Sequence, residues 1–160
     1  MKTKISIALI SLLFMMACGT AEQPKEGEQA VDNSKIILKA YNDMYVVLNS
    51  DSVLVASEAD ATKAAVFEKI DQGNGKWALK SAAGRFVSDD RGKQNYLIAN
   101  RTAVGEWEQF DILDAAEGSK TNLKATSGKV VCVDGGNGFM LIASRDNAST
   151  WEAFTIEPKK

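Results

Sequence analysis

Short apolar stretches follow one another along residues 35–160, and polar turns separate them. Several stretches alternate as half-buried strands do: Leu97 and Ala99 lie two residues apart, so their side chains face the same side of a strand. Asn74-Gly75 and residues 135–138 (GGNG) fall between such stretches, and asparagine and glycine accept the positive φ angles of tight hairpins. The pattern predicts an all-β domain.

The same pattern occurs three times in the same order. Each unit holds a Leu-Lys pair, a turn leading into a second apolar strand, a third strand with an alanine and a fourth with a phenylalanine. Both marker residues repeat after 43 and then 44 residues, at Ala56, Ala99 and Ala143 and at Phe67, Phe110 and Phe154. The recurring leucines and phenylalanines should meet in one core: Leu38, Leu79, Leu123, Leu97, Leu141, Phe67, Phe110 and Phe154. Residues 59–66 are rich in alanine but align with loops of the later units, so we expect a loop or a single turn there.

Three such units predict a β-trefoil. Four short strands cannot bury an apolar face alone, but three copies can close into a pseudo-threefold barrel capped by hairpins. A β-sandwich would not require three equal units, and propellers typically use four or more blades.

The repeated residues are similar to the unit of the fascin-like β-trefoil family. The third unit carries the likeness in residues 128–134 (GKVVCVD), 141–145 (LIASR) and 151–156 (WEAFTI), and residues 97–110 of the second unit match closely. The resemblance covers residues 35–158. The first unit departs from it: Ala64 stands where a tryptophan would be, and Ile70 lies three residues after Phe67 rather than two. Three identical sites are therefore not expected. The Gln-x-Trp signature of ricin-type lectins is absent, so the galactose-site residues of those lectins are not carried over.

The N-terminus predicts a targeting segment. Lys2 and Lys4 precede the uncharged residues 5–16, a run too short to span a bilayer comfortably but right for a signal peptide. Residues 15–18 (MMAC) resemble a bacterial lipobox, which implies cleavage before Cys18 and acylation of that cysteine. The alternatives are an ordinary secretory peptide or a short membrane anchor.

The resulting organisation has three parts: a signal peptide at 1–17, the lipidated Cys18 with a polar, flexible tether at 18–34, and the β-trefoil domain at 35–160. Gly19 rather than aspartate follows the cysteine, which by analogy with Gram-negative sorting favours the outer membrane. We therefore expect a lipid-anchored protein of the bacterial cell envelope.

Composition argues against several functions. The chain has no histidine, which removes the commonest general base and metal ligand. If Cys18 carries lipid, Cys132 has no disulfide partner, and its apolar surroundings at 129–133 indicate a small buried residue. A net charge of -2 without a long basic run argues against nucleic acid. We expect no enzyme, cofactor or metal site.

Several polar and aromatic residues have structural explanations. Asp89 and Asp90 are adjacent, so in a strand they would face opposite sides, and we interpret them as a polar hairpin start. Side chains at one repeat position just after the second strand should cap the turn: Asn49, Asp90 and Asp134. Two Trp-Glu pairs recur and should belong to the fold, the tryptophans packing at the core or the barrel edge: Trp107-Glu108 and Trp151-Glu152.

The best candidates for ligand binding lie in the second unit. Trp77 and Tyr96 have no aromatic counterpart in the other units, so the fold needs them less. Asn100-Arg101 follow the third strand, and a planar amide and guanidinium suit sugar hydroxyls or carboxylates. The predicted site is shallow and built mainly from loops: Trp77, Asp90, Tyr96, Asn100 and Arg101.

Two functions follow as alternatives. Bacterial proteins with the fascin-like domain often carry it beside carbohydrate-active domains, which favours a glycan-binding envelope lipoprotein. The other alternative is a lipoprotein that binds or scaffolds an envelope protein. Actin-type bundling, which uses several trefoils in tandem, is not expected of one bacterial trefoil.

Overall fold

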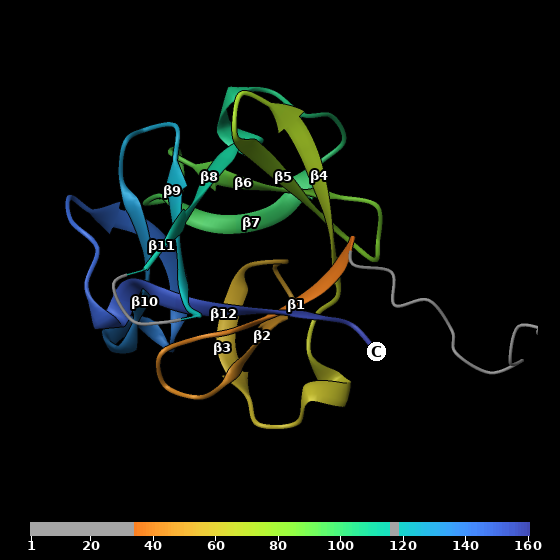
Figure 1. Cartoon of the computed structure of the whole chain (residues 1–160), viewed down its shortest axis with the longest axis vertical. Coiled ribbons are helices and arrows are strands. Elements are labelled where there is room, and N and C mark those ends of the chain that lie inside the picture. The colour runs from red at the N-terminus through yellow and green to blue at the C-terminus, as the bar shows by residue number, and fades with distance from the viewer. Residues whose placement is uncertain (1–33, 116–118) are drawn as a thin grey trace, which may run out of the picture. The chain divides into compact units, whose positions relative to one another are not determined.

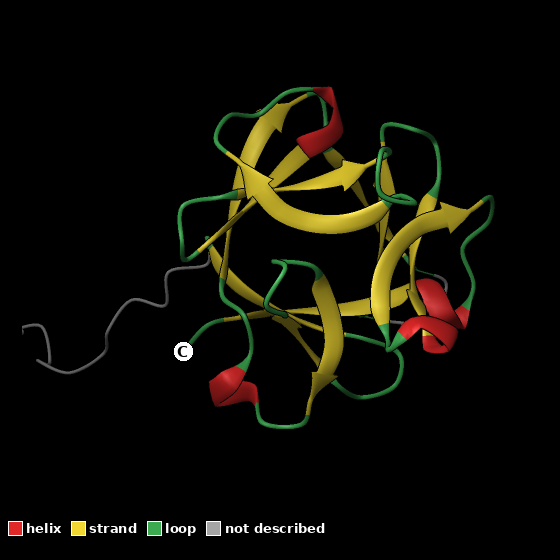
Figure 2. Cartoon of the chain, turned by 180° about the vertical axis from the view of Figure 1, so that it is seen from behind, coloured by secondary structure: helices red, strands yellow, loops and turns green. Residues whose placement is uncertain are grey.

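The computed structural model describes residues 34–115 and 119–160, so the predicted signal peptide, Cys18 and nearly all of the predicted tether lie outside the described residues. The described residues form twelve strands (Figure 1): β1 (Lys35–Lys39), β2 (Tyr45–Leu48), β3 (Leu54–Glu58), β4 (Phe67–Gly73), β5 (Lys76–Ser81), β6 (Phe86–Asp90), β7 (Tyr96–Arg101), β8 (Phe110–Asp114), β9 (Thr121–Ala125), β10 (Val130–Asp134), β11 (Met140–Arg145) and β12 (Ala153–Pro158). Four single-turn 3-10 helices lie between them, seen in red in Figure 2: η1 (Ala61–Lys63), η2 (Glu106–Glu108), η3 (Gly135–Asn137) and η4 (Thr150–Glu152).

Six strands close into a barrel. Antiparallel pairing runs from β1 through β12, β9, β8, β5 and β4 and returns to β1. The first and last strands, β1 and β12, lie side by side (Figure 1). Leu38 pairs with Ile156 between them. Three hairpins, β2–β3, β6–β7 and β10–β11, cap one end and pair with one another at Val55–Met140, Tyr96–Ile142 and Val53–Ile98. The predicted β-trefoil, with three units of four strands, is confirmed.

One hydrogen bond recurs at all three contacts between the capping hairpins. The amides of the three matching alanines donate to a carbonyl of the neighbouring hairpin at 2.9 Å: Ala56 to Phe139, Ala99 to Ser52 and Ala143 to Asn95. The acceptors occupy one repeat position, and each has a left-handed backbone with φ of 61° or 62°. Alanine recurs there because each side chain is buried beneath the next hairpin, with at most 3% of its surface exposed.

The core is the predicted one. All eight of the recurring leucines and phenylalanines are at most 1% exposed. Cys132 is buried and free, as expected of a small apolar residue. Residues 59–66 form loop and the single turn η1, also as predicted. No helix in residues 34–115 and 119–160 is long and apolar enough to cross a membrane.

Candidate functional site

Four of the five predicted site residues lie on the β6–β7 hairpin. Asp90 ends β6 directly opposite Tyr96, the first residue of β7. At the other end the register shifts: Arg101 pairs with Phe86, but Ala99 pairs with Val87, so Asn100 is an extra bulged residue. A bulge redirects the side chains beside it, and Asn100 is accordingly exposed.

Equivalent bulges occur in the other two hairpins. The extra residue is Ser57 between β2 and β3 and Ser144 between β10 and β11. The bulge therefore belongs to the fold, and what varies is the residue after it: Glu58, Arg101 or Arg145. The second and third units place an arginine there.

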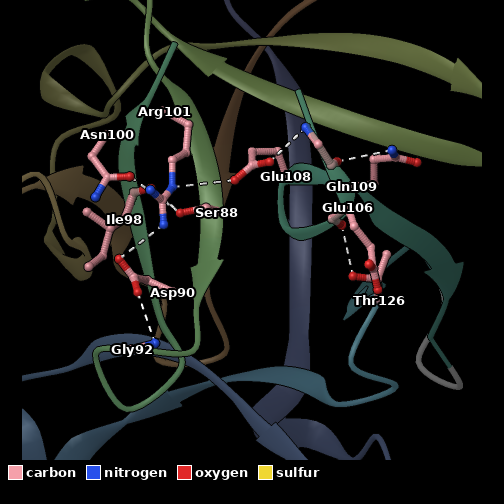
Figure 3. A network of polar contacts seen from close by, with 11 residues as sticks. Ser88, Asp90, Gly92, Ile98, Asn100, Arg101, Glu106, Glu108, Gln109 and Thr126 are labelled. Atoms are coloured by element: carbon pink, nitrogen blue, oxygen red, sulfur yellow. Dashed lines mark hydrogen bonds and ion pairs between the residues drawn. The ribbon is translucent and has the colours of Figure 1, made fainter. Parts of the chain in front are cut away.

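Arg101 is held between two carboxylates (Figure 3). Its Nη2 lies 3.6 Å from Asp90 Oδ2, and its Nε lies 3.6 Å from Glu108 Oε1. Both carboxylates are buried, with 11% and 8% of their side chains exposed, whereas 40% of the Arg101 side chain is exposed. Asn100 Oδ1 lies beside Arg101 and accepts from Ser88 Oγ at 3.4 Å (Figure 3). The hairpin thus presents an oriented guanidinium and an amide to solvent.

The three predicted turn caps are confirmed. Asn49 Oδ1 accepts the amide of Val53 at 2.9 Å, and Asp90 Oδ1 accepts that of Gly92 at 3.1 Å. Asp134 Oδ1 accepts the amide of Gly136 at 3.0 Å. Because one oxygen of Asp90 caps the turn and the other faces Arg101, Asp90 orients the guanidinium.

Glu108 and Glu152 also belong to the fold, as predicted. Glu108 Oε2 accepts the amide of Gly105 at 2.8 Å, and Glu152 Oε2 accepts that of Ser149 at 2.8 Å. Each carboxylate thereby stabilises the start of a short helix while its other oxygen faces an arginine. The third-unit pair, Arg145 Nε to Glu152 Oε1, is 3.5 Å apart.

Asp89 corrects the sequence interpretation. It is not a solvated hairpin start: it lies within β6, 0% exposed, at the repeat position of Leu48 and Val133. Its Oδ2 accepts from Ser127 Oγ at 3.0 Å, whereas its Oδ1 is buried without a hydrogen-bond partner. Burial raises the pKa of this carboxyl above its usual value. Alignment with Leu48 and Val133 was the sequence signal that could have revealed it.

The remaining predicted residues are spread apart. Trp77 lies on β5 opposite Asp71 and Phe110, with Lys69 Nζ 4.2 Å from its ring centre. No hydrogen bond, ion pair or ring contact among the described residues joins Trp77 to the β6–β7 hairpin. Tyr96 lines a hollow of about 440 Å³ between the hairpins, together with Asn49, Asp51, Val53, Gly92, Lys93, Gln94, Ile98 and Met140.

Arg101 lines a different shallow hollow of about 430 Å³ above η2, with Trp107 and Glu108 in its wall. The structure therefore brings Asp90, Asn100 and Arg101 together and places Tyr96 at the edge of the same hairpin. The five residues do not line one pocket.

The two recurring tryptophans differ. Trp107 is half-buried, and the guanidinium carbons of Arg91 and Arg101 lie 5.3 and 5.9 Å from its ring centre. Trp151 is 56% exposed and stacks on Tyr41. The predicted packing at the core or barrel edge is confirmed for Trp107. It is wrong for Trp151, which is a surface residue. Tyr41, its stacking partner, was not among the predicted ligand-binding residues.

In residues 34–115 and 119–160 no three acidic or cysteine side chains are grouped so that they could hold a metal ion. What the described surface offers is hydrogen-bonding groups and aromatic faces, which suit binding.

Solved structures with a similar fold include designed and natural β-trefoils. ThreeFoil, a designed threefold-symmetric protein, matches with a TM-score of 0.63 and 14% identity over 77% of this chain and 97% of that one. SeviL, solved with asialo-GM1 saccharide, matches with a TM-score of 0.62 and 12% identity over 79% of this chain and 98% of that one.

A Polyporus squamosus lectin, solved with an influenza-binding sialylated epitope, matches with a TM-score of 0.65 and 14% identity over 79% of this chain. The match covers 49% of the lectin, so this chain spans about half of its length. At these identities the likeness establishes the fold alone. A search of curated proteins by sequence found no match.

The family model of the fascin domain matches residues 27–112, more than half of the chain. With its three four-stranded units and closed barrel, the chain belongs to the fascin domain family.

Proposed function

We propose that this protein is a non-catalytic binding module that recognises carbohydrate at the bacterial cell envelope. The observation that carries the proposal is Arg101, whose guanidinium is half-exposed at the wall of a shallow hollow and held by two buried carboxylates. A guanidinium presents planar donors in a fixed geometry, which suits hydroxyl pairs and carboxylates.

The Arg101 side chain is already held in place before any ligand binds, and this favours a role in ligand binding. Asp90 and Glu108 restrict the Arg101 side chain, so a ligand loses less conformational entropy on meeting it than on meeting a free arginine. Asn100 adds an exposed amide beside it. A shallow, polar site of this kind exchanges hydrogen bonds with water and desolvates little apolar surface, so we expect weak binding.

The fold neighbours agree with carbohydrate recognition, since one is a lectin and another was solved with a saccharide. The absence of histidine and the buried, structural roles of Asp90 and Glu108 leave no evident acid–base pair, so catalysis forms no part of the proposal.

The proposal includes a lipid anchor at Cys18 in the outer membrane. The lipobox-like residues 15–18 motivate it. Each buried methylene contributes about 0.8 kcal/mol and stable attachment needs more than one acyl chain, so a diacylated or triacylated cysteine would hold the protein at the membrane.

An array of neutral and acidic oligosaccharides probed with the detergent-solubilised full chain tests the function. We expect selective signals that Arg101→Lys weakens, because lysine keeps the charge beside the carboxylates but loses the planar fork. Arg85→Lys, an exposed arginine in the β5–β6 turn, is the matched control and should bind as the wild type does. An empty array together with specific capture of an envelope protein would favour the scaffolding alternative.

A further inference from the structure

One position of the repeat shows which aromatic residues the fold can do without. Three residues before the core phenylalanine the units carry Ala64, Trp107 and Trp151. Ala64 is buried, with 7% exposure, so the first unit closes without a tryptophan. Trp107 is half-buried under two arginines, whereas Trp151 leaves more than half of its surface in solvent. The large side chain of Trp151 is therefore not required by the core.

Tyr41 has no aromatic counterpart in the other units, although it is partly buried and packs against the edge of the core. It follows Ala40, whose amide donates to the carbonyl of Met44, and the matching bonds are Ser81 to Arg85 and Ala125 to Lys129. The residues equivalent to Tyr41 are accordingly Ala82 and Thr126. Neither is aromatic, so a tyrosine at this turn is an addition particular to the first unit.

These two added aromatic residues meet across the junction of the third and first units. Their ring centres are 5.9 Å apart and their planes differ by 12°. The contact joins the β1–β2 turn to η4, segments at opposite ends of the described chain that pairing of β1 with β12 brings together. In this stacked arrangement Tyr41 holds the plane of the indole from one side, and the 56% exposure of Trp151 leaves indole surface in solvent.

We propose that Tyr41 and Trp151 form a stacking platform for a pyranose ring with equatorial hydroxyls, such as a β-linked glucose or N-acetylglucosamine. The faces of such a ring carry axial C–H groups with partial positive charge, which are attracted to the negative face of an aromatic ring. The inference rests on the proposed carbohydrate function but uses a site separate from the β6–β7 hairpin.

The surroundings suit a sugar better than a protein. Residues 144–150, which lead to Trp151, are all exposed and carry hydroxyl, amide, carboxylate and guanidinium groups. Arg145, with 52% of its side chain exposed, is held by the buried carboxylate of Glu152 at 3.5 Å. Protein interfaces typically need a larger apolar centre than two rings. An aromatic surface with a polar edge can stack a sugar ring and bond its hydroxyls.

The test measures binding of the full chain to arrayed oligosaccharides of β-linked glucose, galactose and N-acetylglucosamine. The variants are Trp151→Ala and Tyr41→Ala, since one other unit has alanine at each of these positions, Ala64 and Ala82. Each should weaken binding by about tenfold or more. Trp151→Ala should change the melting temperature little, whereas Tyr41→Ala also loses packing against the core, so its folding is checked by thermal denaturation. Trp151→Phe and Tyr41→Phe keep an aromatic face and should retain most of the binding. Phe139→Asn removes an exposed aromatic residue elsewhere and should bind as the wild type does.

The outcomes separate this inference from the proposed function. If the wild type binds and the two alanine variants bind equally well while folded, the platform is refuted and the carbohydrate function stands. If the wild type binds none of these oligosaccharides but binds acidic ones, the platform is refuted and the carbohydrate function stands; if it binds neither kind, both are refuted. Loss of binding in the alanine variants with retention in the phenylalanine variants supports the platform.

Discussion

The carbonyl oxygen of Phe139 accepts the amide of Ala56 at 2.9 Å while Phe139 itself holds a left-handed backbone with φ of 61°. Ser52 and Asn95 make the equivalent bond with the same backbone conformation. A bulky residue in that conformation is strained, whereas asparagine tolerates it. The third unit therefore keeps the hydrogen bond at a conformational cost.

Phe139→Asn should raise the stability of the domain by about 1 kcal/mol, because it places in the third unit the residue that the second unit uses. The Phe139 side chain is 42% exposed, so little apolar burial is lost. Urea denaturation checks the change. The reciprocal substitution, Asn95→Phe, should lower the stability of the domain. If both substitutions changed the unfolding free energy in the same direction, the strain argument would be contradicted.

Asp89→Asn should stabilise the domain increasingly as pH rises. Burial raises the folded-state pKa of Asp89, so the folded protein binds this proton more tightly than the unfolded chain. Below the usual aspartate pKa both states are protonated and the group makes no difference. As pH rises through the raised pKa, the folded state must hold a buried charge and loses stability, whereas asparagine stays neutral.

Denaturation of wild type and Asp89→Asn at a series of pH values checks this: the gain should be larger near neutral pH than in acid, and it is reduced by loss of the ion pair between Asp89 Oδ2 and Arg91 Nε at 3.6 Å. Asp146→Asn is the control with the opposite sign. Its hydrogen bond with Lys129 lowers the pKa of Asp146, so its stabilising effect is present above the usual aspartate pKa and is lost as pH falls through the lowered value. A pH-independent difference for Asp89→Asn would overturn the prediction.

Phe110→Ala should cost roughly 3–5 kcal/mol of unfolding free energy, since it empties a fully buried position of the core. Chemical denaturation measures the loss. Leu113→Ala on the same strand, β8, is the matched control: Leu113 is 44% exposed, and its truncation should cost far less.

Arg101→Ala should destabilise the domain by about 1 kcal/mol, whereas Arg101→Lys should have a smaller effect. Alanine leaves the buried carboxylates of Asp90 and Glu108 without their cation, but the half-exposed arginine is screened by solvent, which limits the loss. A double-mutant cycle of Arg101→Ala with Glu108→Gln measures the coupling, and additive effects would show that the pair contributes nothing.

Cys18→Ser should release the protein from membranes and prevent labelling by a fatty-acid analogue. The reason is that acylation requires the cysteine sulfur of the lipobox-like sequence. Fractionation and metabolic labelling of the wild type and the variant measure both effects, with Cys132→Ser as the control that should remain labelled. Unchanged labelling of Cys18→Ser would exclude lipidation at this position.

Much of the site on the β6–β7 hairpin could be predicted from local pattern. Strand periodicity and the repeat alignment placed Asp90 at a turn cap, as the structure has it. Asn100-Arg101 were expected after the third strand, in a site built from loops, but they are the last two residues of β7, because the bulge at Asn100 lets the pairing continue to Arg101. Trp77 lies apart because it is on a barrel strand, while Asp90, Asn100 and Arg101 are on a capping hairpin. That a residue is aromatic and has no aromatic counterpart in the other units does not indicate whether it lies on a barrel strand or on a capping hairpin.

The sequence by itself determined the three units, their four strands, the buried leucines and phenylalanines and the turn caps, because each depends on spacing within one unit. Only the tertiary structure decided which units meet. Tyr41 and Trp151 are 110 residues apart in the sequence and stack because β1 pairs with β12. Likewise Asp89 of the second unit meets Ser127 of the third across a junction between units. Such contacts depend on closure of the barrel, since periodicity sets which way a side chain faces within its strand but not which neighbour it finds there.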